Sequence, residues 1–156
     1  MIFVSVGTHN QQFDRLLMAI DKAINMGAIK EEVFAQIGHS TYVPKNFKHC
    51  KFMSIDEFDK CVKNCSLFIT HAGEGNIGTG LQFEKKMIVM PRLKRFGEHT
   101  NDHQLELADA IGKNKQAIIV LGSDITGALK EVKKLNLQGT AHAKGIINII
   151  NNFLGE

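Results

Sequence analysis

Several features that mark specialised classes of protein are missing from this sequence. Its 156 residues hold only three cysteines, Cys50, Cys61 and Cys65, and no basic leader precedes the first apolar run. We therefore expect no disulfide scaffold and a reducing, cytoplasmic setting. No stretch approaches the ~20 consecutive apolar residues that a membrane span needs. The net charge of +3 is too small to indicate a nucleic-acid partner.

The sequence also shows no internal repeat, low-complexity tract or linker, so we expect one domain over residues 1–156. Short β-rich apolar runs alternate with segments of helical periodicity. This alternation predicts an α/β fold, a Rossmann-like parallel sheet with helices on both faces. The predicted strands are residues 2–6, 33–37, 49–53, 67–70, 87–90 and 117–121.

Helices are predicted between these strands and at the end of the chain. Ser54 and Glu57 have the spacing of a capping box, which predicts a helix to about residue 64. The longest loops, 38–48 and 92–100, are of the length that often carries function. The other predicted helices are residues 13–24, 76–85, 101–111 (or 102–111), a helix capped by Ser123 or Asp124, and 143–154.

A glycine-rich motif follows the fourth predicted strand. Gly73, Gly75 and Gly78 match G-x-G-x-x-G, between a strand and a helix. Helix N-termini favour anions, and open α/β sheets bind ligands at the carboxyl ends of their strands. The motif therefore predicts a site for a phosphorylated ligand, the alternative being a turn that needs glycine only for packing. A dinucleotide site is disfavoured, because that fingerprint normally follows the first strand, which here ends in Gly7 and Thr8.

Basic and imidazole side chains surround this motif. His71 ends the strand before the glycines, where a ligand contact is expected. Arg92, Lys94 and Arg95 follow the next strand. Three roles are open for these basic residues: they bind phosphate, they face a partner or anionic lipid, or they form an ordinary solvated charge run.

His99 and His103 are four residues apart, but the segment lacks the glutamate of the zincin motif, so we predict no metal site. Cys61 and Cys65 are interpreted as core-facing. Asp102 is a candidate helix cap.

Eight short segments of the chain are FVSVGTH (3–9), FDRL (13–16), QIG (36–38), STY (40–42), THAG (70–73), PRL (91–93), GEH (97–99) and NDHQLEL (101–107). Together they resemble the family-28 glycosyltransferases, in particular their nucleotide-sugar-binding C-terminal half. The nearest likeness is to stand-alone catalytic subunits of two-subunit enzymes. These are the eukaryotic dolichol-linked N-acetylglucosaminyltransferase and the bacterial enzymes that extend undecaprenyl-linked sugars for capsule or exopolysaccharide.

The resemblance implies one half of a GT-B architecture, a UDP-sugar donor, and no metal or other cofactor. Thr79 stands where related enzymes carry a ribose-binding glutamate, which leaves that contact open. Glu74 would repel a diphosphate unless it points away or accepts a sugar hydroxyl. The implied donor-binding residues are Gly7, Thr8, His71, Gly73, Glu74, Gly75, Asn76, Thr79, Arg92, His99, Asp102, His103 and Gln104.

The implied reaction moves a hexose to a lipid-linked, undecaprenyl-diphosphate saccharide. His9 is the candidate catalytic base, and a partner chain is the other source of one. A membrane-anchored subunit with the acceptor domain is expected to recruit this chain to the inner face of the plasma membrane. The tail helix, 143–154, either docks there or packs on its own sheet. Two further readings stay open: a non-catalytic nucleotide-sugar-binding or regulatory subunit, and a dinucleotide-dependent enzyme.

Overall fold

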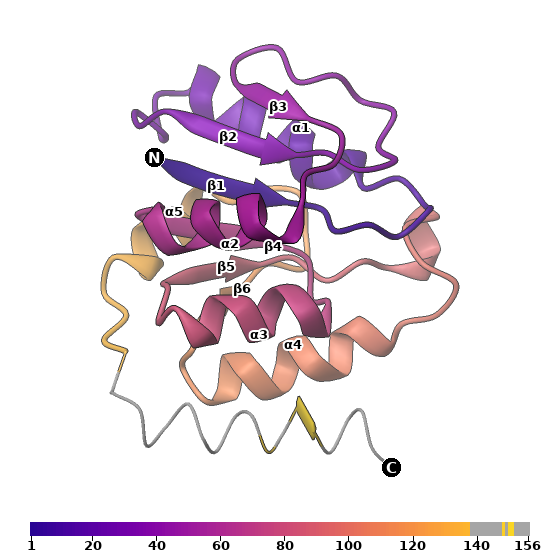
Figure 1. Ribbon diagram of the computed structural model, residues 1–156, viewed down its shortest axis with the longest axis vertical. Coiled ribbons are helices and arrows are strands. Elements are labelled where there is room, and N and C mark those ends of the chain that lie inside the picture. The colour runs from indigo at the N-terminus through magenta and orange to yellow at the C-terminus, as the bar shows by residue number, and fades with distance from the viewer. Residues whose placement is uncertain (138–147, 149, 152–156) are drawn as a thin grey trace.

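The computed structural model describes residues 1–137, 148, 150 and 151, and shows the predicted parallel sheet (Figure 1). Six strands pair in parallel in the order β3-β2-β1-β4-β5-β6. This is the strand order of a doubly wound fold, and the order reverses between β1 and β4. The strands are β1 (Ile2–Ser5), β2 (Val33–Gln36), β3 (Lys48–Cys50), β4 (Leu67–Thr70), β5 (Met87–Val89) and β6 (Ala117–Ile119).

Helices cover both faces of the sheet, as the sequence predicts (Figure 1). α1 (Asp14–Asn25) and α5 (Thr126–Val132) pack on one face. α2 (Ile55–Asn64), α3 (Glu74–Gln82) and α4 (His103–Lys113) pack on the other, and a short 3-10 helix, η1 (Lys94–Phe96), lies in the loop between β5 and α4.

Residues along β1 alternate between two cores. Ile2 and Val4 point into the core beneath α1, whereas Phe3 points into the core beneath α2 and α3. Strands that are buried on both faces read as continuous apolar runs, and this is why these strands are visible in the sequence. Ile150, in the tail, is buried in the second core. Apart from residues 148, 150 and 151, the predicted tail helix lies outside the described residues.

Several boundaries differ from the predicted ones. The helix predicted from residue 76 starts at Glu74, because Gly73 is the extended N-cap residue whose carbonyl accepts the first helical hydrogen bond, from Ile77. β3 and β6 end two or three residues early, because both are edge strands that pair on one side only. The Ser54–Glu57 capping box is confirmed. No helix of the described residues has the length and hydropathy of a membrane span.

Candidate functional site at the carboxyl edge of the sheet

A cleft of about 560 Å³ opens at the carboxyl ends of β1 and β4, where the strand order reverses. Ligands of open α/β sheets bind at such a switch point. We call it the carboxyl-edge cleft. Its lining comprises Gly7, Thr8, His9, Gln36, Met53, Ser54, Ile55, Phe58, Asp59, His71, Gly73, Gly75, Asn76, Thr79, His99 and Gln104.

The first turn of α3 forms one wall of this cleft. Its N–H groups have no intrahelical partners and, with the helix dipole, form an anion-binding surface. A Cβ built on Gly75 meets no atom within 4 Å, so the cleft at this turn is open to a ligand. Thr79, one turn later, donates its hydroxyl to the Gly75 carbonyl (3.0 Å) and keeps oxygen lone pairs for a ligand.

Asn76 fixes this turn to the sheet. Its Nδ2 donates to Ser5 Oγ (3.0 Å) and Thr70 Oγ1 (2.9 Å), at the ends of β1 and β4. Thr70 Oγ1 donates in turn to the Ser5 carbonyl (2.9 Å). These contacts hold both strand ends and the helix start in one arrangement. The Asn76 amide nitrogen is therefore engaged by the protein, and its carbonyl oxygen is the side-chain atom left for a ligand.

His71 lies at the floor of the cleft, wedged between two glycine segments. A Cβ on Gly7 would lie 2.4 Å from His71 Nε2, and one on Gly73 would lie 2.1 Å from Cε1. Gly7 also has a φ of +79°, which favours glycine. Burial, with the Arg92 charge nearby, lowers the pKa of His71 to about 3. The ring is therefore neutral at physiological pH.

His9 and His99 both line the cleft and pack edge to face, with ring centroids 4.5 Å apart. Burial lowers the pKa of each, and the Arg92 charge lowers both further. His9 Nδ1 donates to Asn10 Oδ1 (3.0 Å), which leaves a lone pair on Nε2. His9 therefore has the protonation state that a general base requires at neutral pH.

Arg92 does not present its charge to the cleft, contrary to the predicted phosphate contact. Its side chain is fully buried, and NH1 and NH2 donate to the carbonyls of Val6, Gln11, Gln12 and Glu98. Desolvation lowers its pKa to about 10, so the buried guanidinium stays charged near neutral pH. Its contacts tie the loop after β1 to the loop after β5, and so set the spacing of His9 and His99.

A second arginine holds the same loop from α1. Arg15 pairs with Glu98 at 2.9 Å, and the two side chains are 11% and 1% exposed. It also donates to the carbonyls of Pro91, Leu121 and Gly122. Nothing in the sequence around Arg15 signals this role, because its partners lie more than 70 residues away.

Three other predicted donor-binding residues lie outside the cleft lining. Glu74 is exposed and is not among the residues that line the cleft. Asp102 stands at the N-cap of α4 but makes no cap hydrogen bond, and instead accepts from the Lys94 N–H (2.9 Å). His103 is exposed and lies 4.0 Å from Glu106. The structure thus brings together the glycine segment, His71, His9, His99 and Gln104.

Some lining residues were missed in the sequence. Gln36 ends β2, and Phe58 and Asp59 come from α2, so these residues lie outside the glycine motif. Ser5 and Thr70, which hold the side chain of Asn76, have the sequence pattern of ordinary strand residues. Among the described residues, no group of three or more His, Cys, Asp or Glu is placed to hold a metal ion.

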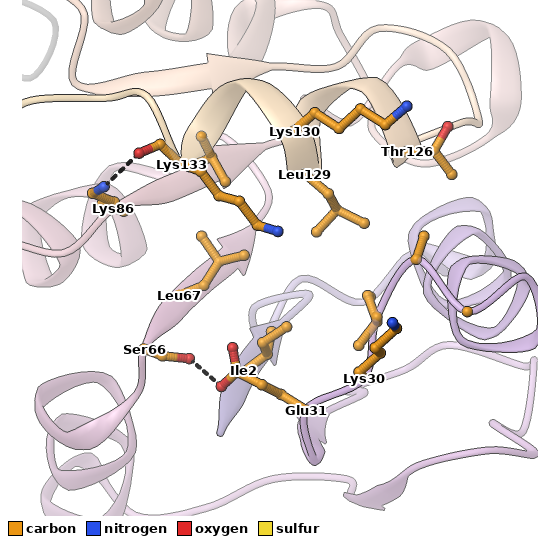
Figure 2. Close-up of a pocket in the computed structure, with 14 residues that line it drawn as sticks. Ile2, Lys30, Glu31, Ser66, Leu67, Lys86, Thr126, Leu129, Lys130 and Lys133 are labelled. Carbon is orange, nitrogen blue, oxygen red and sulfur yellow. Dashed lines mark hydrogen bonds between the residues drawn. The ribbon is translucent and has the colours of Figure 1, made fainter.

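A second cavity, about 630 Å³, lies at the opposite end of the strands (Figure 2). Ile2 and Leu67, the first residues of β1 and β4, line it, together with Lys130 of α5 and Lys133 at the end of that helix. Lys86 Nζ donates to the Lys133 carbonyl (3.1 Å), so this lysine is already engaged. Since the helix N-terminus and the strand carboxyl ends lie at the other edge, we place the candidate site there.

Residues 1–148 match the Glycosyltransferase family 28 C-terminal domain. The chain belongs to this family. None of the curated proteins matches it significantly.

This family 28 domain is similar in fold to several solved glycosyltransferases. The glycotransferase of kitacinnamycin superposes with a TM-score of 0.63 at 20% identity, over 96% of this chain and 38% of that one. The calicheamicin glycosyltransferase has a TM-score of 0.61 at 13% identity, over 99% of this chain and 39% of that one. The glycosyltransferase VinC, in complex with dTDP, has a TM-score of 0.52 at 13% identity, over 97% of this chain and 41% of that one. The domain thus spans about two fifths of these proteins.

Proposed function

We propose that this chain is the donor-binding part of a glycosyltransferase that moves a hexose from a UDP-sugar to a lipid-linked, undecaprenyl-diphosphate saccharide in capsule or exopolysaccharide synthesis. The observation that carries the proposal is the cleft at the switch point of a family 28 domain, with the first turn of α3 open at Gly75 and with neutral His71 beside it.

The chemistry that such a cleft supports is departure of a nucleoside diphosphate. An acceptor hydroxyl attacks the anomeric carbon, the bond to the diphosphate oxygen breaks, and a base takes the hydroxyl proton. The N–H groups of the first turn of α3 and the helix dipole stabilise the charge that develops on the diphosphate. His9 Nε2, in the lining of the cleft, is placed to take the proton.

The acceptor site is assigned to a second polypeptide. The solved glycosyltransferases above are more than twice as long as this chain, and the chain matches one portion of each. Because the sequence resembles catalytic subunits of two-subunit glycosyltransferases, we infer that a membrane-anchored subunit with an acceptor domain completes the enzyme.

A nucleotide-binding screen tests the donor assignment. The purified chain is heated with UDP, dTDP or NAD at equal concentrations, and dTDP is included because the VinC structure holds it. A ligand at ~100 times its dissociation constant adds about 2.7 kcal/mol of stability, which raises Tm measurably. We expect UDP to stabilise most. Stabilisation by NAD alone would favour the dinucleotide-dependent reading. UDP binding with no sugar transfer in the presence of the partner would favour a regulatory subunit.

A further inference from the structure

The carboxamide of Gln104 joins three segments at the floor of the cleft. Its Oε1 accepts from the backbone N–H groups of Ala72 (3.2 Å) and Arg92 (3.0 Å), and its Nε2 lies 3.1 Å from His71 Nδ1. Backbone N–H groups only donate, so the atom that they face is the amide oxygen. Two independent donors therefore fix which end of the amide points at His71.

This orientation decides where the proton of His71 lies. The Gln104 nitrogen donates to His71 Nδ1, so Nδ1 accepts and the neutral ring carries its hydrogen on Nε2. The ring is tightly enclosed, because a Cβ built on either Gly7 or Gly73 would overlap it. Nε2 has no hydrogen-bond partner among the described residues, and His71 lines the cleft.

We propose that Gln104 is a positioning residue that holds His71 as the Nε2–H tautomer, so that His71 offers a neutral hydrogen-bond donor to the diphosphate of the nucleotide. The identity of the ligand rests on the function proposed above, whereas the tautomer does not. The amide oxygen of Gln104 is taken up by two backbone donors, so this role differs from the sugar contact that the family resemblance implies.

The groups around His71 keep its ring neutral. The charge of Arg92, after β5, opposes a second proton on the ring, and His9 and His99 oppose it when they are themselves protonated. Glu98, a nearby carboxylate, is engaged by Arg15 and by the Leu93 N–H. The donor is therefore present without a pH-dependent charge.

The first test reads the tautomer without nucleotide. Nitrogen-15 spectra of the labelled imidazoles at pH 8 distinguish a protonated from an unprotonated ring nitrogen. In the wild-type chain we expect hydrogen on Nε2 of His71. In Gln104→Glu, one carboxylate oxygen keeps the two backbone N–H bonds, while the other oxygen only accepts, so the hydrogen should move to Nδ1. Hydrogen on Nδ1 in the wild type, or an unchanged ring in the variant, would overturn the proposal.

The second test measures UDP affinity at pH 8 by calorimetry. The probe is UDP without a sugar, because a residue that only contacts sugar leaves its affinity unchanged. Gln104→Glu places a lone pair of His71 Nε2 against the diphosphate, and we expect affinity to fall by about 10- to 100-fold, the range for a hydrogen bond to a charged group. Gln82→Glu, an exposed change of the same charge at the far end of α3, should bind like the wild type.

The outcomes distinguish failure of the proposed function from failure of the positioning role of Gln104. If the wild-type chain binds no nucleotide, the proposed function fails while the tautomer result stands. If UDP binds equally to the wild type and to Gln104→Glu, the positioning role is wrong and the donor site is unaffected. Loss in Gln82→Glu as well would assign the effect to charge and would overturn the role of Gln104.

Discussion

At the scale of single residues, Gly75 offers the sharpest probe of the ligand. Its Cβ position is open and faces the cleft. Gly75→Val should therefore fold, while its side chain fills the space that a diphosphate needs near the α3 N–H groups. We expect UDP affinity to drop by at least about tenfold, which corresponds to ~1.4 kcal/mol. Calorimetry on the purified variant measures this.

Gly78→Val is the matched control. Gly78 lies in the same helix, has no atom within 4 Å of a built Cβ, and is not among the cleft-lining residues. Both variants place valine in α3, so their intrinsic helix propensities change alike. If both bind UDP equally well, the diphosphate does not contact the first turn of α3.

His71 should make stability depend on pH. Its folded pKa of about 3 lies below the ordinary value of 6.5, so between these limits the unfolded chain binds more protons. Stability therefore falls as pH falls from 6.5 towards 3, at up to about 1.4 kcal/mol per pH unit. From pH 7 to pH 5 the contribution of His71 alone reaches roughly 2 kcal/mol.

Urea unfolding at pH 7 and pH 5 checks this, with His71→Asn for comparison. The asparagine oxygen still accepts from Gln104, but it does not titrate. The variant should lose less stability than the wild type over this interval. Equal losses would mean that His71 titrates normally in the folded chain.

At the scale of elements, the Arg15–Glu98 pair joins α1 to the loop that carries His99. Arg15→Met leaves the Glu98 carboxylate buried without its cation, and we expect a loss of about 3 kcal/mol in the free energy of unfolding. The double variant Arg15→Met, Glu98→Met should recover part of this loss. Urea unfolding of the four proteins gives the coupling energy.

The exposed pair Lys48–Glu32 provides the contrast, with side chains 83% and 68% exposed. Lys48→Met should change stability by less than about 1 kcal/mol. A similar effect of Arg15→Met and Lys48→Met would show that the Glu98 carboxylate is hydrated in solution.

The order of the elements was predictable from the sequence, because strands buried on both faces form apolar runs that period and length identify. The start of α3 was not. Glycines have poor helix propensity, so the sequence placed Glu74 and Gly75 in a turn, whereas the contacts of Asn76 with β1 and β4 hold them in a helix. Tertiary contacts overrode local preference there.

The same reason limits prediction of the site. His71 and Gly75 were placed at the cleft because they belong to one strand–turn–helix segment, and Thr79 was placed there by the family resemblance. The burial of Arg92 depends on carbonyls more than 80 residues earlier in the chain, and no local pattern reports it.

At the scale of the whole molecule, our proposal divides the donor and acceptor sites between two polypeptides. We predict that the chain alone binds UDP but transfers sugar to a lipid-linked acceptor only with a membrane-anchored partner. Co-expression with a candidate subunit, followed by membrane fractionation, should move the chain from the soluble fraction to the membrane fraction. Full-rate transfer by the purified chain alone would contradict the two-subunit arrangement.

The contacts of His71 also bear on how the sequence can change over evolutionary time. A side chain at either Gly7 or Gly73 would overlap the imidazole, so these three positions form an epistatic unit. A lineage that keeps the histidine must keep both glycines, while one that replaces it with a smaller residue frees position 73 to drift. Position 7 stays restricted by its positive φ even then. In a combinatorial library of positions 7, 71 and 73, functional variants that keep His71 should therefore keep glycine at both other positions. Other residues at position 73 should be found only where His71 is replaced by a smaller residue.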